Sequence, residues 1–134
     1  SPSTPLAATS VALSGEDLRQ LGTKAAGVAL SMVLPDALRT NVALVRDYQG
    51  AMRALGFQTF SSRSFEGYVN ARVLIEGLER AGRDLTRARL CTALAEIRRD
   101  DLGGFVIDYA GNAPYVGSHF IDLGILGANG RFVG

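Results

Sequence analysis

The spacing of hydrophobic residues changes along the chain, and its first part predicts a strand, a helix and a strand. Residues 27–34, GVALSMVL, form an unbroken apolar run that ends at Pro35, which is typical of a strand buried on both faces. An earlier apolar run, at 5–13, predicts a short strand that leads into a loop of small residues. Between the two strands, Ser14 is placed to cap a short helix that closes near Gly22.

The middle of the chain has the spacing of three consecutive helices. The first begins at Thr40 and ends at Gly56, the second is capped by Ser64 and closed by Gly82, and the third is capped by Thr86. The positions expected to face inward are Leu44, Val45, Tyr48, Met52 and Leu55 in the first, Tyr68, Ala71, Leu74, Ile75 and Leu78 in the second, and Leu90, Ala93, Leu94 and Ile97 in the third.

From Phe105 onward the pattern returns to that of strands. The run FVIDY is followed by a turn, then by a strand at 119–126, and Asn129-Gly130 predicts a hairpin into RFV. Alternation in the long strand places His119, Ile121, Leu123 and Ile125 on one face, and Phe120, Asp122, Gly124 and Leu126 on the other. The order β-α-β, three helices and β-β-β predicts an α/β fold.

Composition narrows the classes of partner. The 134 residues are 47% hydrophobic, enough for the core of one domain or part of one, and the net charge of +1 is not gathered into a basic stripe. We therefore expect no nucleic-acid partner. No window approaches the roughly 18 apolar residues of a membrane helix, and no signal peptide is apparent.

The reactive side chains predict neither an enzyme nor a cofactor or metal site. His119 is the only histidine and has no second His or Cys nearby, so an ordinary zinc site cannot form, and a structural or surface role is expected. Cys91, between apolar residues of the third helix, is expected to be a small buried hydrophobe. The carboxylates at 100, 101, 108 and 122 do not form a catalytic pair by spacing.

Ser10, next to Thr9, follows the end of the first predicted strand. Small hydroxyl side chains at the carboxyl end of a strand in an open α/β sheet lie where such folds bind ligands. A plain turn or helix cap is the alternative reading.

Four longer segments carry a resemblance to a known family. They are 44-LVRDYQGAMRALG-56, 64-SFEGYVNARVLIEGLERAG-82, 86-TRARLCTALAEI-97 and 101-DLGGFVIDYAGNAPYVGSHFIDLGILGANGRFV-133. Taken in order, they resemble the C-terminal part of the type I periplasmic solute-binding proteins of ABC transporters, in the leucine/isoleucine/valine-binding branch.

The resemblance implies two α/β lobes joined by a three-stranded hinge, with a small ligand trapped between them and no catalysis. Residues 1–34 would belong to the second lobe, 35–100 would add helices to the first, and 101–134 would form a hinge crossing and the final strands of the second lobe. The implied ligand is an amino acid or related small carboxylate. The implied partner is the membrane permease of an ABC transporter, and the implied location is the periplasm.

The resemblance also implies which residues bind the ligand and which form the hinge. Thr9, Ser10 and Val11 would face the cleft between the lobes, with Ser10 giving or accepting a hydrogen bond to a polar group of the ligand. Pro35 would lie in the hinge, and Gly103 and Gly104 would let the chain make its last crossing.

Most of the family's pocket would lie upstream of Ser1, so the isolated chain is expected to bind ligand weakly or not at all. Its uncovered apolar faces are expected to be buried in an intertwined homodimer. Two alternatives remain open: the ligand-sensing domain of a receptor, and a small stand-alone interaction domain.

Overall fold

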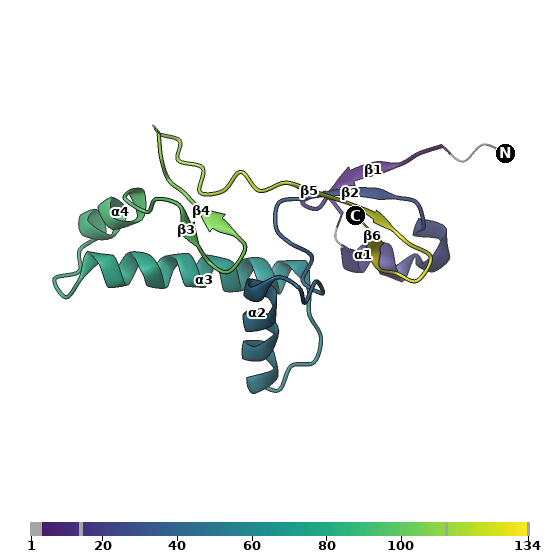
Figure 1. Cartoon of the computed structure of the whole chain (residues 1–134), viewed down its shortest axis with the longest axis horizontal. Helices are drawn as coiled ribbons and strands as arrows, with labels where there is room; N and C mark the ends of the chain where they lie inside the picture. Colours follow the sequence, from purple (N-terminus) through teal and green to yellow (C-terminus); the bar gives the residue numbers. More distant parts are fainter. Residues whose placement is uncertain (1–3, 14, 112, 134) are drawn as a thin grey trace.

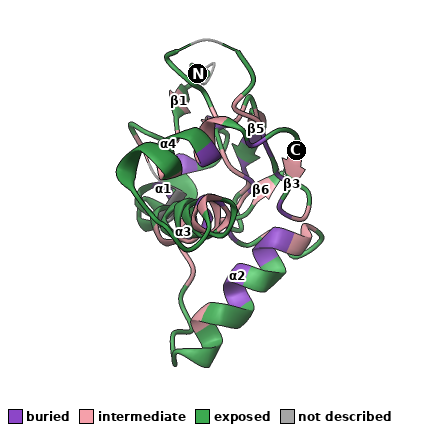
Figure 2. Cartoon of the chain, turned by 90° about the vertical axis from the view of Figure 1, so that its left-hand side faces the viewer, coloured by how far each residue is buried: buried purple, intermediate pink, exposed green. Residues whose placement is uncertain are grey.

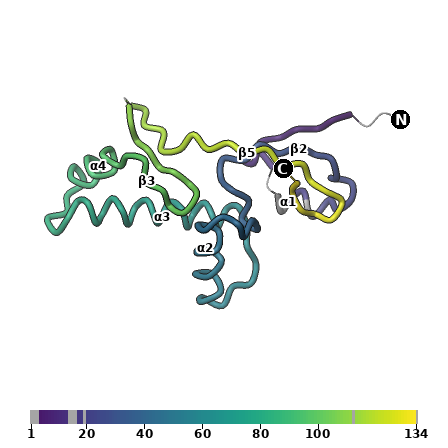
Figure 3. The backbone as a smooth tube through the Cα atoms, in the orientation of Figure 1, coloured from purple at the N-terminus to yellow at the C-terminus, as the bar shows by residue number. Residues whose placement is uncertain are grey.

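The fold is given by a computed structural model that describes residues 4–13, 15–111 and 113–133. The elements form two units that lie side by side and are joined by two long crossings of the chain (Figures 1 and 3). The cap predicted at Ser14 lies outside the described residues.

The first unit, here called the sheet unit, is built from both ends of the chain. It contains β1 (Ala7–Thr9), α1 (Gly15–Gln20), the 3-10 helix η1 (Gly22–Ala25), β2 (Ala29–Met32), β5 (Asp122–Leu126) and β6 (Phe132–Val133). The strand order is β1-β2-β5-β6, with β1 and β2 parallel and the other pairs antiparallel. The predicted hairpin at Asn129-Gly130 is confirmed, since it joins the paired strands β5 and β6.

Only one face of this sheet is covered by the described residues. The core consists of Leu18, Ala25, Leu30, Met32 and Leu126. The predicted alternation in 119–126 is confirmed, because Gly124 and Leu126 are buried while Ile121, Leu123 and Ile125 are exposed. The prediction that β2 is buried on both faces is wrong, because α1 and η1 cover one face and leave Ala29 and Ser31 half-buried on the other.

The second unit, here called the helical unit, comes from the middle of the chain. It contains α2 (Ala43–Ala54), α3 (Ser62–Ala81), α4 (Arg87–Ala95), and the short strands β3 (Asp100–Asp101) and β4 (Val106–Ile107), which pair with each other. Its core consists of Ala37, Leu44, Val45, Tyr48, Phe65, Val69, Ile97, Leu102, Phe105 and Ile107. The second half of α2 projects away from the other helices, and its last residues are mostly exposed (Figure 2).

The buried side of α3 differs from the predicted one. Phe65, Val69 and Gly77 are buried, whereas Leu74 is 46% exposed and Ile75 is 51% exposed. On a helix with many apolar residues, spacings of three and four define more than one apolar stripe. In α3 the neighbouring elements α4 and β4 cover only one of these stripes. For α4 the cap at Thr86 is confirmed, because its hydroxyl accepts a hydrogen bond from the Arg89 amide.

The helix α3 also begins earlier than predicted. Its cap is Ser61, whose hydroxyl accepts a hydrogen bond from the Ser64 amide at 3.1 Å, so Ser64 lies inside the first turn. The sequence between Gly56 and Ser64 has no apolar spacing that marks this start.

Gly103 and Gly104 lie in the turn between β3 and β4, inside the helical unit. Their backbone φ angles are +98° and +94°, and the Gly103 carbonyl accepts a hydrogen bond from the Leu44 amide at the start of α2. The Asp101 carboxylate accepts hydrogen bonds from both glycine amides, and these bonds lower its pKa. The two glycines therefore serve a tight turn, contrary to the expectation that they make the last crossing, which follows Asp108 instead (Figure 3).

Candidate functional site

A hollow of about 190 Å³ lies between the two units. It is lined by Ser10, Val11, Leu30, Met32, Val33, Leu34, Pro35, Asp36, Ala37, Ser62, Arg63, Glu66 and Phe132. Two of the three predicted ligand-binding residues, Ser10 and Val11, are therefore brought together with the beginning of α3.

The sheet-unit wall is the turn that follows β1. The Ser10 amide donates a hydrogen bond to the Ser31 carbonyl at 2.8 Å, which extends the parallel pairing of β1 and β2 by one residue. The Thr9 carbonyl then accepts hydrogen bonds from the amides of Ala12 and Leu13, and this closes the turn. Thr9, the third predicted residue, does not line the hollow.

The opposite wall is the first turn of α3, which is held by part-buried hydrogen bonds. The Tyr48 hydroxyl is 2.5 Å from the Ser64 hydroxyl and accepts a hydrogen bond from the Ser61 amide at 3.2 Å. Tyr48 is fully buried and packs its ring against Phe65. Ser62, Arg63 and Glu66 are thus presented to the hollow by a turn that α2 fixes in place.

The base of the hollow is the first crossing between the units. The Ala37 carbonyl accepts a hydrogen bond from Gln49 Nε2 at 2.9 Å, and Ala37 is buried in the helical core. Pro35 is buried in this crossing, at the place where a hinge was predicted, and its hinge role stays a prediction.

The side chains of the hollow suit a small molecule with both polar and apolar parts. Val11 and Leu34 offer apolar surface, and Ser10 and Ser62 offer hydroxyl groups. The start of α3 adds one positively charged and one negatively charged side chain, Arg63 and Glu66. Ligand pockets usually measure roughly 300–1,000 Å³, so these residues enclose only part of such a ligand.

Ser62, Arg63 and Glu66 were not predicted as site residues. The predicted start of α3 at Ser64 leaves Ser62 and Arg63 outside the helix. The available signal was the run of serines that follows α2, because serine favours the start of a helix.

The reactive residues singled out from the sequence lie elsewhere. Cys91 is exposed on α4, so the prediction of a buried thiol is wrong; α4 buries Ala93 on its inner side and turns Cys91 outward. His119 is exposed in the second crossing. Within the described residues, no three His, Cys, Asp or Glu side chains gather as metal ligands would, and none of the helices is long and apolar enough to span a membrane.

No protein-family model and no curated protein matches the chain. Solved structures do match it. A substrate-binding periplasmic protein from Ralstonia solanacearum is 32% identical, with a TM-score of 0.87 over 98% of this chain and 38% of its own. An extracellular ligand-binding receptor from Verminephrobacter eiseniae is 26% identical, with a TM-score of 0.83 over 97% of this chain and 37% of its own.

A possible leucine/isoleucine/valine-binding protein from Rhodopirellula baltica shares the fold, with a TM-score of 0.85 at 24% identity over 98% of this chain and 36% of its own. The chain has the fold of a segment of the type I periplasmic solute-binding proteins. It spans somewhat more than a third of the solute-binding structures it matches. These neighbours are binding proteins and receptors, not enzymes. How the chain divides between the two lobes of the solute-binding fold stays a prediction.

Proposed function

We propose that the chain is part of the substrate-binding component of an ABC transporter for amino acids or related small carboxylates. The observation that carries the proposal is the hollow between the units, where Ser10 and Val11 of one wall face the first turn of α3 in the other. The fold shared with a substrate-binding periplasmic protein supports it. In this account Ser10 forms a hydrogen bond with a polar group of the ligand, and Val11 contacts its apolar part.

The small volume of the hollow supports a further part of the proposal: the isolated chain binds ligand weakly or not at all. The missing walls would come from the rest of a longer polypeptide. Isothermal titration of that polypeptide with a panel of amino acids and small carboxylates tests this. Replacing Ser10 by Ala should weaken binding about tenfold, because a buried ligand group would lose its partner.

Thr92→Ala is the matched control, because Thr92 is an exposed hydroxyl residue on α4, away from the hollow. Equal affinity of the Ser10→Ala variant and the parent would contradict the role given to Ser10. Absence of binding by every member of the panel would contradict the proposed ligand class.

Location and partner follow from the same proposal. The polypeptide would reside in the periplasm and deliver its ligand to a membrane permease. An immunoblot of periplasmic and cytoplasmic fractions, with an antibody against this chain, should show a periplasmic band well above the 14.2 kDa of this chain. A band at 14.2 kDa would favour a stand-alone interaction domain instead.

A ligand-sensing domain of a receptor is the second candidate, and the similarity to an extracellular ligand-binding receptor favours it. The two candidates differ in what the longer polypeptide contains. A membrane-spanning helix in the same polypeptide would indicate a receptor, whereas co-purification with a separate permease would indicate a transporter component.

A further inference from the structure

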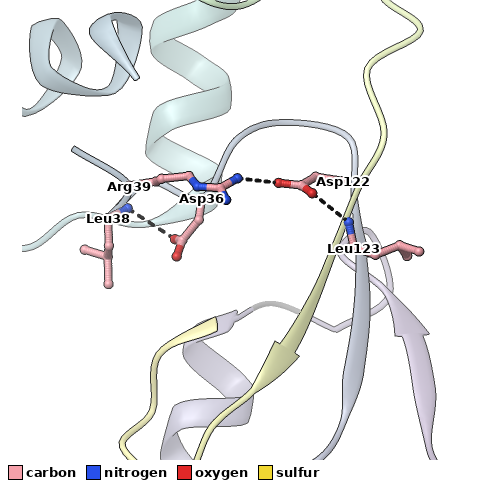
Figure 4. A network of polar contacts seen from close by, with 5 residues as sticks. All are labelled: Asp36, Leu38, Arg39, Asp122 and Leu123. Atoms are coloured by element: carbon pink, nitrogen blue, oxygen red, sulfur yellow. Dashed lines mark hydrogen bonds and ion pairs between the residues drawn. The ribbon is translucent and has the colours of Figure 1, made fainter. Parts of the chain in front are cut away.

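An ion pair connects the two units close to the first crossing. Arg39 Nη1 lies 2.8 Å from Asp122 Oδ2, and the two residues are 83 positions apart in the chain (Figure 4). Arg39 belongs to the segment between β2 and α2, and Asp122 is the first residue of β5. The pair thus reaches from the edge of the helical unit to the sheet.

Arg39 is fixed to the helical unit. Its amide donates a hydrogen bond to the Asp36 carbonyl at 2.9 Å, and its carbonyl accepts one from the Val42 amide at 3.2 Å. Ala37, two residues before Arg39, is buried in the helical core, and its carbonyl accepts a hydrogen bond from Gln49 of α2. The guanidinium group therefore moves with α2.

Asp122 is fixed to the sheet unit. It is paired with Met32 in the ladder between β2 and β5, and its Oδ1 accepts a hydrogen bond from the Leu123 amide at 2.9 Å. This bond orients the carboxylate and directs Oδ2 toward Arg39, as Figure 4 shows.

The hydrophobic packing near the ion pair does not by itself fix the angle between the two units. The helical core and the sheet core have no residue in common. Beside the ion pair lies a second hollow of about 420 Å³, lined by residues of both units that include Gln49, Phe60 and Arg131. A region with this much open space resists rotation less than a close-packed interface does.

We propose that Arg39 and Asp122 form a strut that sets the angle between the two units. Because both partners are anchored to their own units, rotation about the crossings separates the charges. The side chains are 38% and 26% exposed, and an ion pair with such exposure changes an equilibrium by roughly two- to fivefold. If the proposed function holds, the strut biases the opening of the ligand cleft.

The distance between two spin labels, measured by pulsed electron resonance, tests the strut without any ligand. Cys91 is exposed on α4 and carries one label, and Lys24→Cys on η1 carries the other. Arg39→Gln and Asp122→Asn should each lower the population at the parental distance about two- to fivefold relative to other distances. Arg39→Lys, which keeps the charge, should retain most of that population.

Arg80→Gln is the matched control. It removes an ion pair of similar exposure with Glu76, and both of those residues lie within α3. Its distance distribution should equal that of the parent. An unchanged distribution in both strut variants, or an equal change in the control, would overturn the proposal.

Salt gives a test that does not depend on the variants being folded. In about 1 M salt, where charges are screened over a few ångströms, the parent should shift toward the distribution expected of Arg39→Gln. A parent distribution that does not respond to salt would overturn the strut. Because no ligand is present, failure of the strut and failure of the proposed transport function are separate results.

Discussion

Tyr48 joins α2 to the turn of α3 that lines the candidate cleft. We expect Tyr48→Phe to lower the free energy of unfolding by about 1–3 kcal/mol, because the Ser61 amide and the Ser64 hydroxyl each lose a partner in a part-buried setting beside the fully buried Tyr48 ring. Urea denaturation measures this difference. Tyr115→Phe, at a side chain that is 52% exposed, should stay within about 0.5 kcal/mol of the parent. A similar loss in the two variants would show that the Tyr48 hydroxyl has no special role.

Asp101 makes the β3–β4 turn sensitive to acid. Hydrogen bonds from the amides of Gly104 and Gly103 lower its pKa below the ordinary 3.8, so its charged form favours the folded chain. This contribution is present above the unfolded pKa and is lost as the pH falls through the lower folded pKa. We expect Asp101→Asn to be less stable than the parent at neutral pH, with the difference narrowing below about pH 4.

Thermal unfolding over a pH series checks the Asp101 prediction. Glu79→Gln is the control, because Glu79 is an exposed carboxylate on α3, outside the turn. A parent and an Asp101→Asn variant that differ equally at every pH would rule out the charge as the cause.

Among the helices, α3 and α4 meet closely at Gly77. A Cβ atom at this position would lie 2.5 Å from Leu94 Cδ2 and 2.9 Å from Leu94 Cγ. We therefore expect Gly77→Val to cost about 1–3 kcal/mol of stability through overpacking. Gly67→Val is the matched control on the same helix, where a Cβ meets nothing within 4 Å, and it should be neutral or slightly stabilising. Equal effects at the two glycines, measured by urea denaturation, would refute close packing at Gly77.

The element order was predictable because the period of apolar residues differs between strands and helices. The predicted inner face of α3 was wrong because its sequence offers more than one apolar stripe. Which stripe is buried depends on how α4 and β4 pack against α3, and the sequence of α3 itself carries no signal of that packing. The same limit applies to Cys91, whose apolar neighbours in sequence do not share its side of α4.

At the scale of the whole molecule, one face of the sheet exposes apolar side chains. Leu123, Ile125 and Val133 are 66%, 55% and 67% exposed, although their residue types are common in cores. Apolar surface of this kind promotes association. We expect the isolated chain to self-associate in sedimentation experiments, and Leu123→Thr combined with Ile125→Thr to shift it toward the monomer with little change in stability.

Val106→Thr serves as the control for the sheet face, because Val106 is 46% exposed but lies on β4 of the helical unit. A parent that sediments as a monomer would contradict the prediction and remove the basis for the intertwined homodimer. That dimer stays a prediction until such a measurement is made.

The candidate site was only half predictable. Ser10 could be placed because it follows a strand, and the carboxyl end of a strand faces a ligand cleft in open α/β sheets. Val11 was implied only by the family resemblance. Arg63 and Glu66 could not, since their approach to Ser10 depends on how two crossings orient separate units. No periodic pattern in the sequence encodes that angle.

Amide NMR of the isotopically labelled longer polypeptide, titrated with amino acids and small carboxylates, tests directly whether a ligand binds between the two units, because it reports binding residue by residue. We expect that at high ligand concentration the amide signals of Ser10, Val11, Ser62, Arg63 and Glu66 shift together, while those of α4 do not. Shifts confined to other surfaces, or none with any ligand of the panel, would contradict a ligand cleft between the two units.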